Sequence, residues 1–135
     1  MAKFKPTMEM PHAKILIVDD SSFTRELVSK MLVQAGFSKP LEAESAGSAL
    51  GAVKANKPDL LILDIDLGGE LDGVDVLRAV KRDTPAVKVI VLSALSQRLL
   101  EEKLMEEQAD AFIVKPFRQE QLLFAVGLAL GYDVM

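Results

Sequence analysis

The sequence places chemically capable side chains directly after four short apolar runs. Asp19 and Asp20 follow the first run, Asp64 the second, Ser93 the third and Lys115 the fourth. Continuous apolar runs of this length are typical of strands buried on both faces. Because an unpaired charge in an apolar interior is costly, these side chains are expected where the strands leave the sheet. Ligands of open α/β sheets bind beyond the carboxyl ends of the strands, so the pattern predicts one site at one sheet edge.

The residue types at this edge suit a divalent cation and a phosphoryl group. Clustered carboxylates raise each other's pKa unless a cation lies among them, and oxygen ligands without His or Cys favour Mg²⁺. A carboxylate such as Asp64, beside Mg²⁺ and Lys115, can attack phosphorus and form an aspartyl phosphate. The Ser93 hydroxyl can donate a hydrogen bond to a phosphoryl oxygen. Each residue alone has an ordinary alternative as a turn acid, an exposed lysine or a strand-end hydroxyl, but their convergence favours the site.

Strands and helices are expected to alternate five times to position these residues. The expected strands are 14–18, 41–44, 60–66, 87–92 and 111–114, and the expected helices are about 21–35, 48–55, 72–83, 96–108 and 118–130. This alternation predicts an α/β protein with a single five-stranded parallel sheet and helices on both faces, joined by right-handed crossovers. In the first helix, Leu27, Met31, Leu32 and Ala35 are spaced as one buried face.

Composition restricts the class of protein. A chain of 135 residues fits one domain with one sizeable core. The net charge of −4 argues against non-specific nucleic-acid binding, and the absence of cysteine excludes disulfides and thiolate metal sites. No apolar run approaches the ~20 residues that span a bilayer, and the first eleven residues lack the apolar core of a signal peptide. A cytoplasmic location without membrane contact is the resulting expectation.

In combination, these motifs resemble the receiver domain of bacterial two-component response regulators, the CheY-like family. The resemblance runs from about residue 14 to residue 130 and rests on four motifs: Asp19-Asp20, the lone strand-end Asp64, Ser93 followed by Ala94, and Lys115-Pro116-Phe117. It implies the flavodoxin-like (β/α)5 receiver fold with strand order 2-1-3-4-5. The chain would then consist of a flexible leader at 1–12, a receiver domain at 13–131 and a tail at 132–135.

The resemblance also implies how the acids act. Asp64 would be phosphorylated by a histidine kinase or a histidine phosphotransfer protein. Asp20, Asp64 and the main-chain carbonyl of Asp66 would bind Mg²⁺, while Asp19 would act mainly through water. The only chemistry implied for the chain is its own phosphorylation and its slow dephosphorylation. The chain is therefore not expected to be an enzyme for other substrates.

Further residues take implied roles in switching and in phosphate lifetime. Ser93 and Lys115 would hold the phosphoryl group, and the Lys115-Pro116 bond would be cis. Phe112 falls at the family's aromatic switch position, with plain core packing as an equal alternative. Asp66 and Leu95 would flank the approach of the hydrolytic water. Because Leu95 is bulky and cannot orient water, a long-lived phosphoryl group is expected.

Two regions depart from a simple receiver pattern. The loop 67–71 carries Gly68-Gly69-Glu70 where the family usually has a proline, and it is one residue longer. The last helix is apolar on more than one stripe from residue 122 to residue 130, which favours a partner or homodimer surface over the face 96–130. The alternative is that ordinary packing covers this helix.

An enzyme class is the alternative to a signalling function. Asp64-Ile65-Asp66 also resembles the opening motif of aspartate-nucleophile phosphatases of the haloacid-dehalogenase type. Chain order argues against that class, because its nucleophile lies on the first strand, whereas here the pair Asp19-Asp20 comes first. The chain also leaves no room for a cap over a substrate. Whether the receiver acts alone or as the front of a longer regulator stays open, as do the kinase and the pathway.

Overall fold

All ten expected elements are present in the structure. A computed structural model describes residues 13–67, 72–94 and 98–131, with only the backbone described at 98–101. The strands are β1 (Ile15–Val18), β2 (Leu41–Ala43), β3 (Leu60–Asp64), β4 (Lys88–Ser93) and β5 (Ala111–Val114). The helices are α1 (Ser22–Gln34), α2 (Ala46–Asn56), α3 (Gly73–Asp83), α4 (Arg98–Glu106) and α5 (Gln119–Leu130). The expected leader, the tail and most of the loop 67–71 lie outside the described residues.

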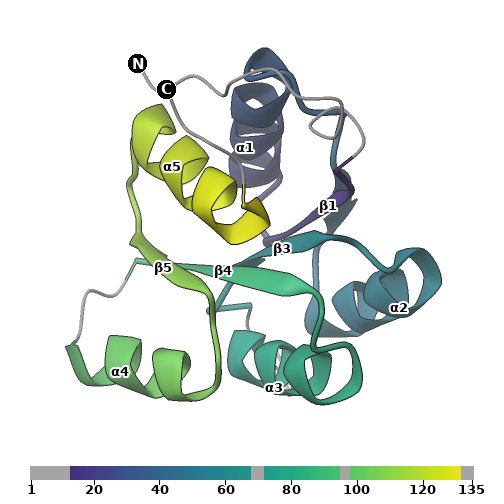
Figure 1. Cartoon of the computed structure of the whole chain (residues 1–135), viewed down its shortest axis with the longest axis vertical. Coiled ribbons are helices and arrows are strands. Elements are labelled where there is room, and N and C mark those ends of the chain that lie inside the picture. Colours follow the sequence, from purple (N-terminus) through teal and green to yellow (C-terminus); the bar gives the residue numbers. More distant parts are fainter. Residues whose placement is uncertain (1–12, 68–71, 95–97, 132–135) are drawn as a thin grey trace.

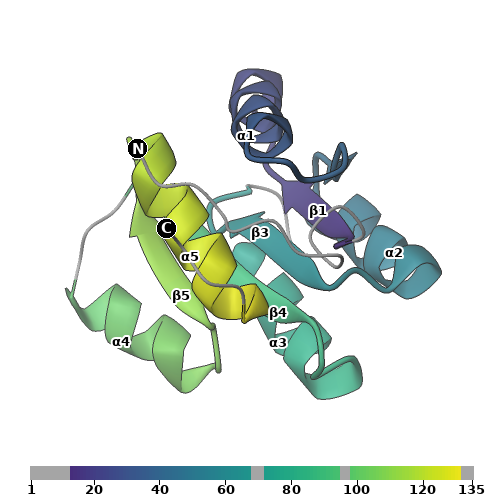
Figure 2. The same ribbon diagram turned by 45° about the horizontal axis from the view of Figure 1, so that its top comes forward.

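The five strands form one parallel sheet in the order β2-β1-β3-β4-β5, as predicted. Helices α1 and α5 cover one face, and α2, α3 and α4 cover the other (Figure 1). Figure 2 shows the same arrangement after a turn, with α5 lying across β5 and β4. Both faces of the sheet are therefore covered, as predicted, and the strands are continuously apolar because both faces are buried.

The register of the sheet sets the level at which the site residues emerge. Val18 of β1 lies opposite Leu63 of β3, so the residues that follow them, Asp19 and Asp64, leave the sheet as neighbours. On the other side of β3, Asp64 lies opposite Leu92 of β4. Strand β3 is thus flanked on both sides at the point where its carboxylate appears.

The core consists of two layers divided by the sheet. Side chains from β1, β3 and β4 alternate between them: Ile17, Ile62 and Ile90 pack toward α1 and α5, and Val18, Leu63 and Val91 pack toward α2 and α3.

None of the helices in the described part of the chain has the length and apolar character needed to span a membrane.

The buried face of α1 differs from the predicted one. Val28 and Leu32 are fully buried and Met31 is partly buried, but Leu27 is 38% exposed. The apolar residues of this helix allow two overlapping four-residue spacings, one through Leu27 and one through Val28. Packing against the sheet selects the second. Ser21 caps the start of this helix by accepting a hydrogen bond from the Thr24 amide.

Helix α5 has buried and exposed apolar sides. Leu122, Leu123 and Val126 are buried against the sheet and α1, whereas Phe124 is 54% and Leu128 63% exposed. The prediction that this helix is apolar on more than its sheet-facing stripe is confirmed. Phe124 and Leu128 also line a groove of about 620 Å³ along β5.

Candidate functional site

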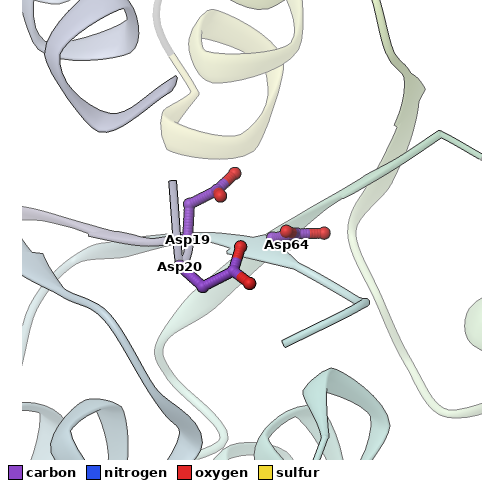
Figure 3. Close-up of side chains that lie close together, drawn as sticks. All are labelled: Asp19, Asp20 and Asp64. Carbon is purple, nitrogen blue, oxygen red and sulfur yellow. The ribbon is translucent and has the colours of Figure 1, made fainter. Parts of the chain in front are cut away.

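Three predicted acids meet at the carboxyl end of the sheet. Carboxylate oxygens of Asp19, Asp20 and Asp64 lie within 4.8 Å of one another. Figure 3 shows these side chains emerging together from the ends of β1 and β3. Asp19 and Asp64 are buried, while Asp20 is exposed to solvent. Asp66 is also exposed, and its carboxylate is not part of this group.

Lys115 brings a positive charge to two of the acids. Its Nζ donates to Asp19 Oδ2 at 2.8 Å and lies 3.4 Å from Asp64 Oδ2. The residue directly follows β5, and its amide donates to the carbonyl of Ser93 at 2.7 Å. The Lys115-Pro116 bond is cis, as the resemblance implied. One ammonium thus serves two buried carboxylates that come from different strands.

Burial and the neighbouring charges together set the electrostatics of the site. Burial and the negative charge of Asp19 raise the pKa of Asp64 above its usual value, although the Asp66 amide and Lys115 pull it down. Burial lowers the pKa of Lys115, but its hydrogen bond to Asp19 and the charge of Asp64 outweigh this, so the net shift is upward. A hard dication fits these residues, because all donors are oxygens and exposed Asp20 leaves one side open to water ligands.

The raised pKa of Asp64 predicts a pH-dependent stability. A folded pKa above the unfolded value of 3.8 means that the folded protein binds this proton more tightly, so ionised Asp64 costs stability at neutral pH. Without Mg²⁺, Asp64→Asn should therefore be more stable than the wild type at pH 7. The difference should narrow as the pH falls through the folded pKa of Asp64.

Urea unfolding across this pH range measures the effect. Saturating Mg²⁺ should favour the wild type over the variant, because a ligand that binds the folded state stabilises it. A wild type that is more stable than Asp64→Asn at pH 7 without Mg²⁺ would contradict the direction of the shift.

The backbone after Asp64 is held tightly in place. The Asp66 amide donates to Asp64 Oδ1 at 3.0 Å, and the Ile65 amide donates to the Leu92 carbonyl at 2.9 Å. The Gly73 amide donates to the Ile65 carbonyl at 3.0 Å, and a Cβ on Gly73 would lie 2.7 Å from the Asp64 carbonyl oxygen. Gly73 was not predicted as a site residue. The signal for it was Asp72-Gly73, where Asp72 caps α3 and the glycine permits close approach to β3.

The remaining predicted site residues are Ser93, Phe112 and Leu95. Ser93 ends β4 at the same sheet edge and is buried. Phe112 is partly buried and packs against the core layer under α2 and α3, which is the packing alternative weighed for it. Leu95 lies outside the described residues.

Fold, site and sequence similarity agree on the class of this protein. Residues 15–127 match the family described as the response regulator receiver domain, and the chain belongs to this family. It is 35% identical over 118 residues to the chemotaxis protein CheY of Bacillus subtilis, covering 87% of this chain and 98% of that protein.

Two further comparisons concern a longer regulator and an isolated receiver domain. The chain is 37% identical to the phosphate regulon transcriptional regulatory protein PhoB of Pseudomonas aeruginosa, covering 81% of this chain but 48% of PhoB. The crystal structure of the receiver domain of NtrX from Brucella abortus superposes with a TM-score of 0.82 at 34% identity, covering 87% of this chain and 98% of that one. These similarities give no support to the phosphatase alternative.

Proposed function

We propose that this receiver is switched by phosphorylation of Asp64. The observation that carries the proposal is the placement of its buried carboxylate beside Asp19, Asp20 and the Lys115 ammonium. An Asp64 oxygen would form a new bond to phosphorus while the donor's bond to phosphorus breaks, and the leaving group keeps that electron pair. The Lys115 ammonium would stabilise negative charge on the phosphoryl oxygens, and the Ser93 hydroxyl would donate a hydrogen bond to one of them.

The acids would hold a magnesium ion. Asp20 and Asp64, with the main-chain carbonyl of Asp66, are the proposed ligands, and Asp19 is proposed to act mainly through water. When bound, Mg²⁺ would supply positive charge that offsets the carboxylates and the incoming phosphoryl group. Incubation with a small phosphodonor and Mg²⁺, followed by mass spectrometry, tests the proposal: one labile phosphoryl group should appear on Asp64.

The proposed phosphodonor is a histidine kinase or a histidine phosphotransfer protein of the same cell, and the proposed location is the cytoplasm. No catalytic activity toward other substrates is proposed. We also propose a division into a leader at 1–12, a receiver at 13–131 and a tail at 132–135.

The phosphoryl group is proposed to persist for a long time, because Asp66 and Leu95 would flank the approach of the hydrolytic water.

The proposed output surface is formed by α4, β5 and α5. Apolar side chains are exposed along it at Val114, Phe124 and Leu128, and the groove beside β5 gives a partner a concave apolar surface. Either a downstream protein or a second copy of this chain would cover it. Phosphorylation would change the affinity for that partner by shifting a two-state equilibrium.

Ser93→Ala should separate phosphorylation from the conformational response. The variant keeps the acids and Lys115, so it should still accept a phosphoryl group. It lacks the hydroxyl that would draw β4 toward that group and make room for Phe112 to move inward. Amide chemical shifts in α4 and α5 should therefore respond to phosphorylation in the wild type and much less in the variant.

Ser93→Thr is the matched control, because it retains the hydroxyl and should retain the response. An equal response in the wild type and Ser93→Ala would show that this side chain does not couple the site to the output surface.

A further inference from the structure

The side chain of Arg25 connects α1 to both strands beside the acid pair. It leaves the helix just after the Ser21 cap, and only 15% of it is exposed. Its Nη1 donates to the main-chain carbonyl oxygen of Asp19 at 2.7 Å. Its Nε donates to Glu42 Oε1 on β2 at 2.9 Å. The guanidinium therefore spans β1 and β2 with two well-formed hydrogen bonds.

This contact completes the fixation of Asp19. The Asp19 amide donates to the Ala43 carbonyl at 3.1 Å, Oδ1 accepts from the Ser21 amide at 2.9 Å, and Oδ2 accepts from Lys115. The carbonyl held by Arg25 is the fourth polar group of the residue. This carbonyl belongs to the peptide that joins Asp19 to Asp20. Its orientation therefore fixes the orientation of the Asp20 backbone.

Asp20 depends on its backbone for its position. Among the residues that the structure describes, its carboxylate has no hydrogen-bond or ion-pair partner, yet it lies within 4.8 Å of the carboxylates of Asp19 and Asp64. In Figure 3 its side chain reaches toward Asp64. Three like charges at this distance repel one another, so the backbone must supply the restraint that keeps Asp20 in the group.

We propose that Arg25 is a positioning residue for the cation site. It fixes the Asp19-Asp20 peptide so that the exposed Asp20 carboxylate stays where a magnesium ion requires it, without touching the ion. This inference rests on the proposed magnesium role of the acids. It adds a residue from outside the acid and lysine group.

The direction of the change in Mg²⁺ affinity when Arg25 is replaced distinguishes a positioning role from an effect of its charge. If Arg25 acted on the site only through its positive charge, its removal would strengthen Mg²⁺ binding, because like charges repel. If it positions Asp20, its removal weakens binding even though a repulsive charge is lost. Replacement of residues that orient metal ligands typically weakens metal affinity by about 10- to 100-fold.

The test is a Mg²⁺ titration of the full chain, followed through the backbone amide shifts of residues 64–66. Arg25→Lys keeps the charge and most of the stem but cannot bridge the Asp19 carbonyl and Glu42, and Arg25→Met removes both charge and donors. Both should bind Mg²⁺ about tenfold more weakly than the wild type. Lys30→Met, which removes an exposed cation from the same helix, should stay within about twofold, since surface charges are well screened.

Unchanged or stronger Mg²⁺ binding in both Arg25 variants would overturn the inference. If only Arg25→Met fails to fold, Arg25→Lys decides the result. If the wild type shows no response to Mg²⁺, the metal part of the proposed function fails, and hydrogen exchange of the Ser21 amide in the metal-free protein judges Arg25 separately. That amide donates to the Asp19 carboxylate, and it should exchange measurably faster in Arg25→Lys than in the wild type, because a less firmly held Asp19 opens more often. An unchanged rate would overturn the inference.

Discussion

Asp64→Asn is expected to abolish phosphorylation by small phosphodonors in the presence of Mg²⁺. The amide nitrogen and oxygen that replace the carboxylate are poor nucleophiles toward phosphorus, and one charge of the cation site is lost at the same time. The geometry otherwise persists, because the amide oxygen can still accept the hydrogen bond from Asp66 that Asp64 Oδ1 accepts now. Intact-mass measurement after incubation with the donor should show no added phosphoryl group.

Unfolding of Asp64→Asn should not be the cause of its missing phosphoryl group, because the variant is expected to be at least as stable as the wild type without Mg²⁺. Burial and Asp19 raise the pKa of Asp64, so a neutral residue at this position should stabilise the metal-free protein. Asp83→Asn, which changes an exposed acid paired with Arg82, is the control and should label like the wild type. Undiminished labelling of a folded Asp64→Asn would place the phosphoacceptor elsewhere.

Lys115→Met should lower the free energy of unfolding at pH 7 by about 2–4 kcal/mol, since removal of one partner from a largely buried ion pair leaves a buried charge uncompensated. Asp19 is 1% exposed, and among the described residues only the Ser21 amide would still donate to its carboxylate. Because methionine preserves most of the volume of the lysine stem, the change isolates the ammonium. Urea denaturation without Mg²⁺ measures the difference.

The pH dependence provides a second check on Lys115. A folded pKa above 10.5 means that the stabilisation by Lys115 is fully present below pH 10.5 and is lost as the pH rises through the folded value. The gap between wild type and variant should close over that range.

Arg82→Met is the control for Lys115→Met. It breaks the exposed Arg82–Asp83 pair of 2.9 Å and should lower stability far less than Lys115→Met does, because solvent screens surface pairs. Similar losses in the two variants would show that the Lys115 contacts contribute no more than a surface pair.

The sequence was sufficient for the sheet and for the acids. A parallel strand buried on both faces is recognisable as a continuous apolar run, and a charge at its end marks the edge of the sheet. Strand order came from the resemblance, since alternation alone does not rank the strands. The register between β1 and β3 then brings Asp19 and Asp64 to one level without further information.

The sequence was insufficient where a choice depends on tertiary contacts. Leu27 and Val28 both fit an apolar helix spacing, and only packing against the sheet buries Val28 and exposes Leu27. Arg25 acts through the main-chain carbonyl of Asp19, and a backbone contact leaves no side-chain pattern to detect. Its part in the site appears only when distant segments are placed side by side.

The ion pair between Lys115 and Asp19 joins residues 96 positions apart, and two strands, β3 and β4, lie between theirs in the sheet. Contacts of such long sequence separation form late in folding, because the entropy of closing a long loop opposes them. During synthesis, Asp19 and Asp64 leave the ribosome well before Lys115. A nascent chain without β5 thus carries two acids destined for burial with no ammonium to pair them. We expect β5 to complete folding by bringing in the Lys115 ammonium. Chains released before residue 115 should therefore not reach the native state and should be open to degradation.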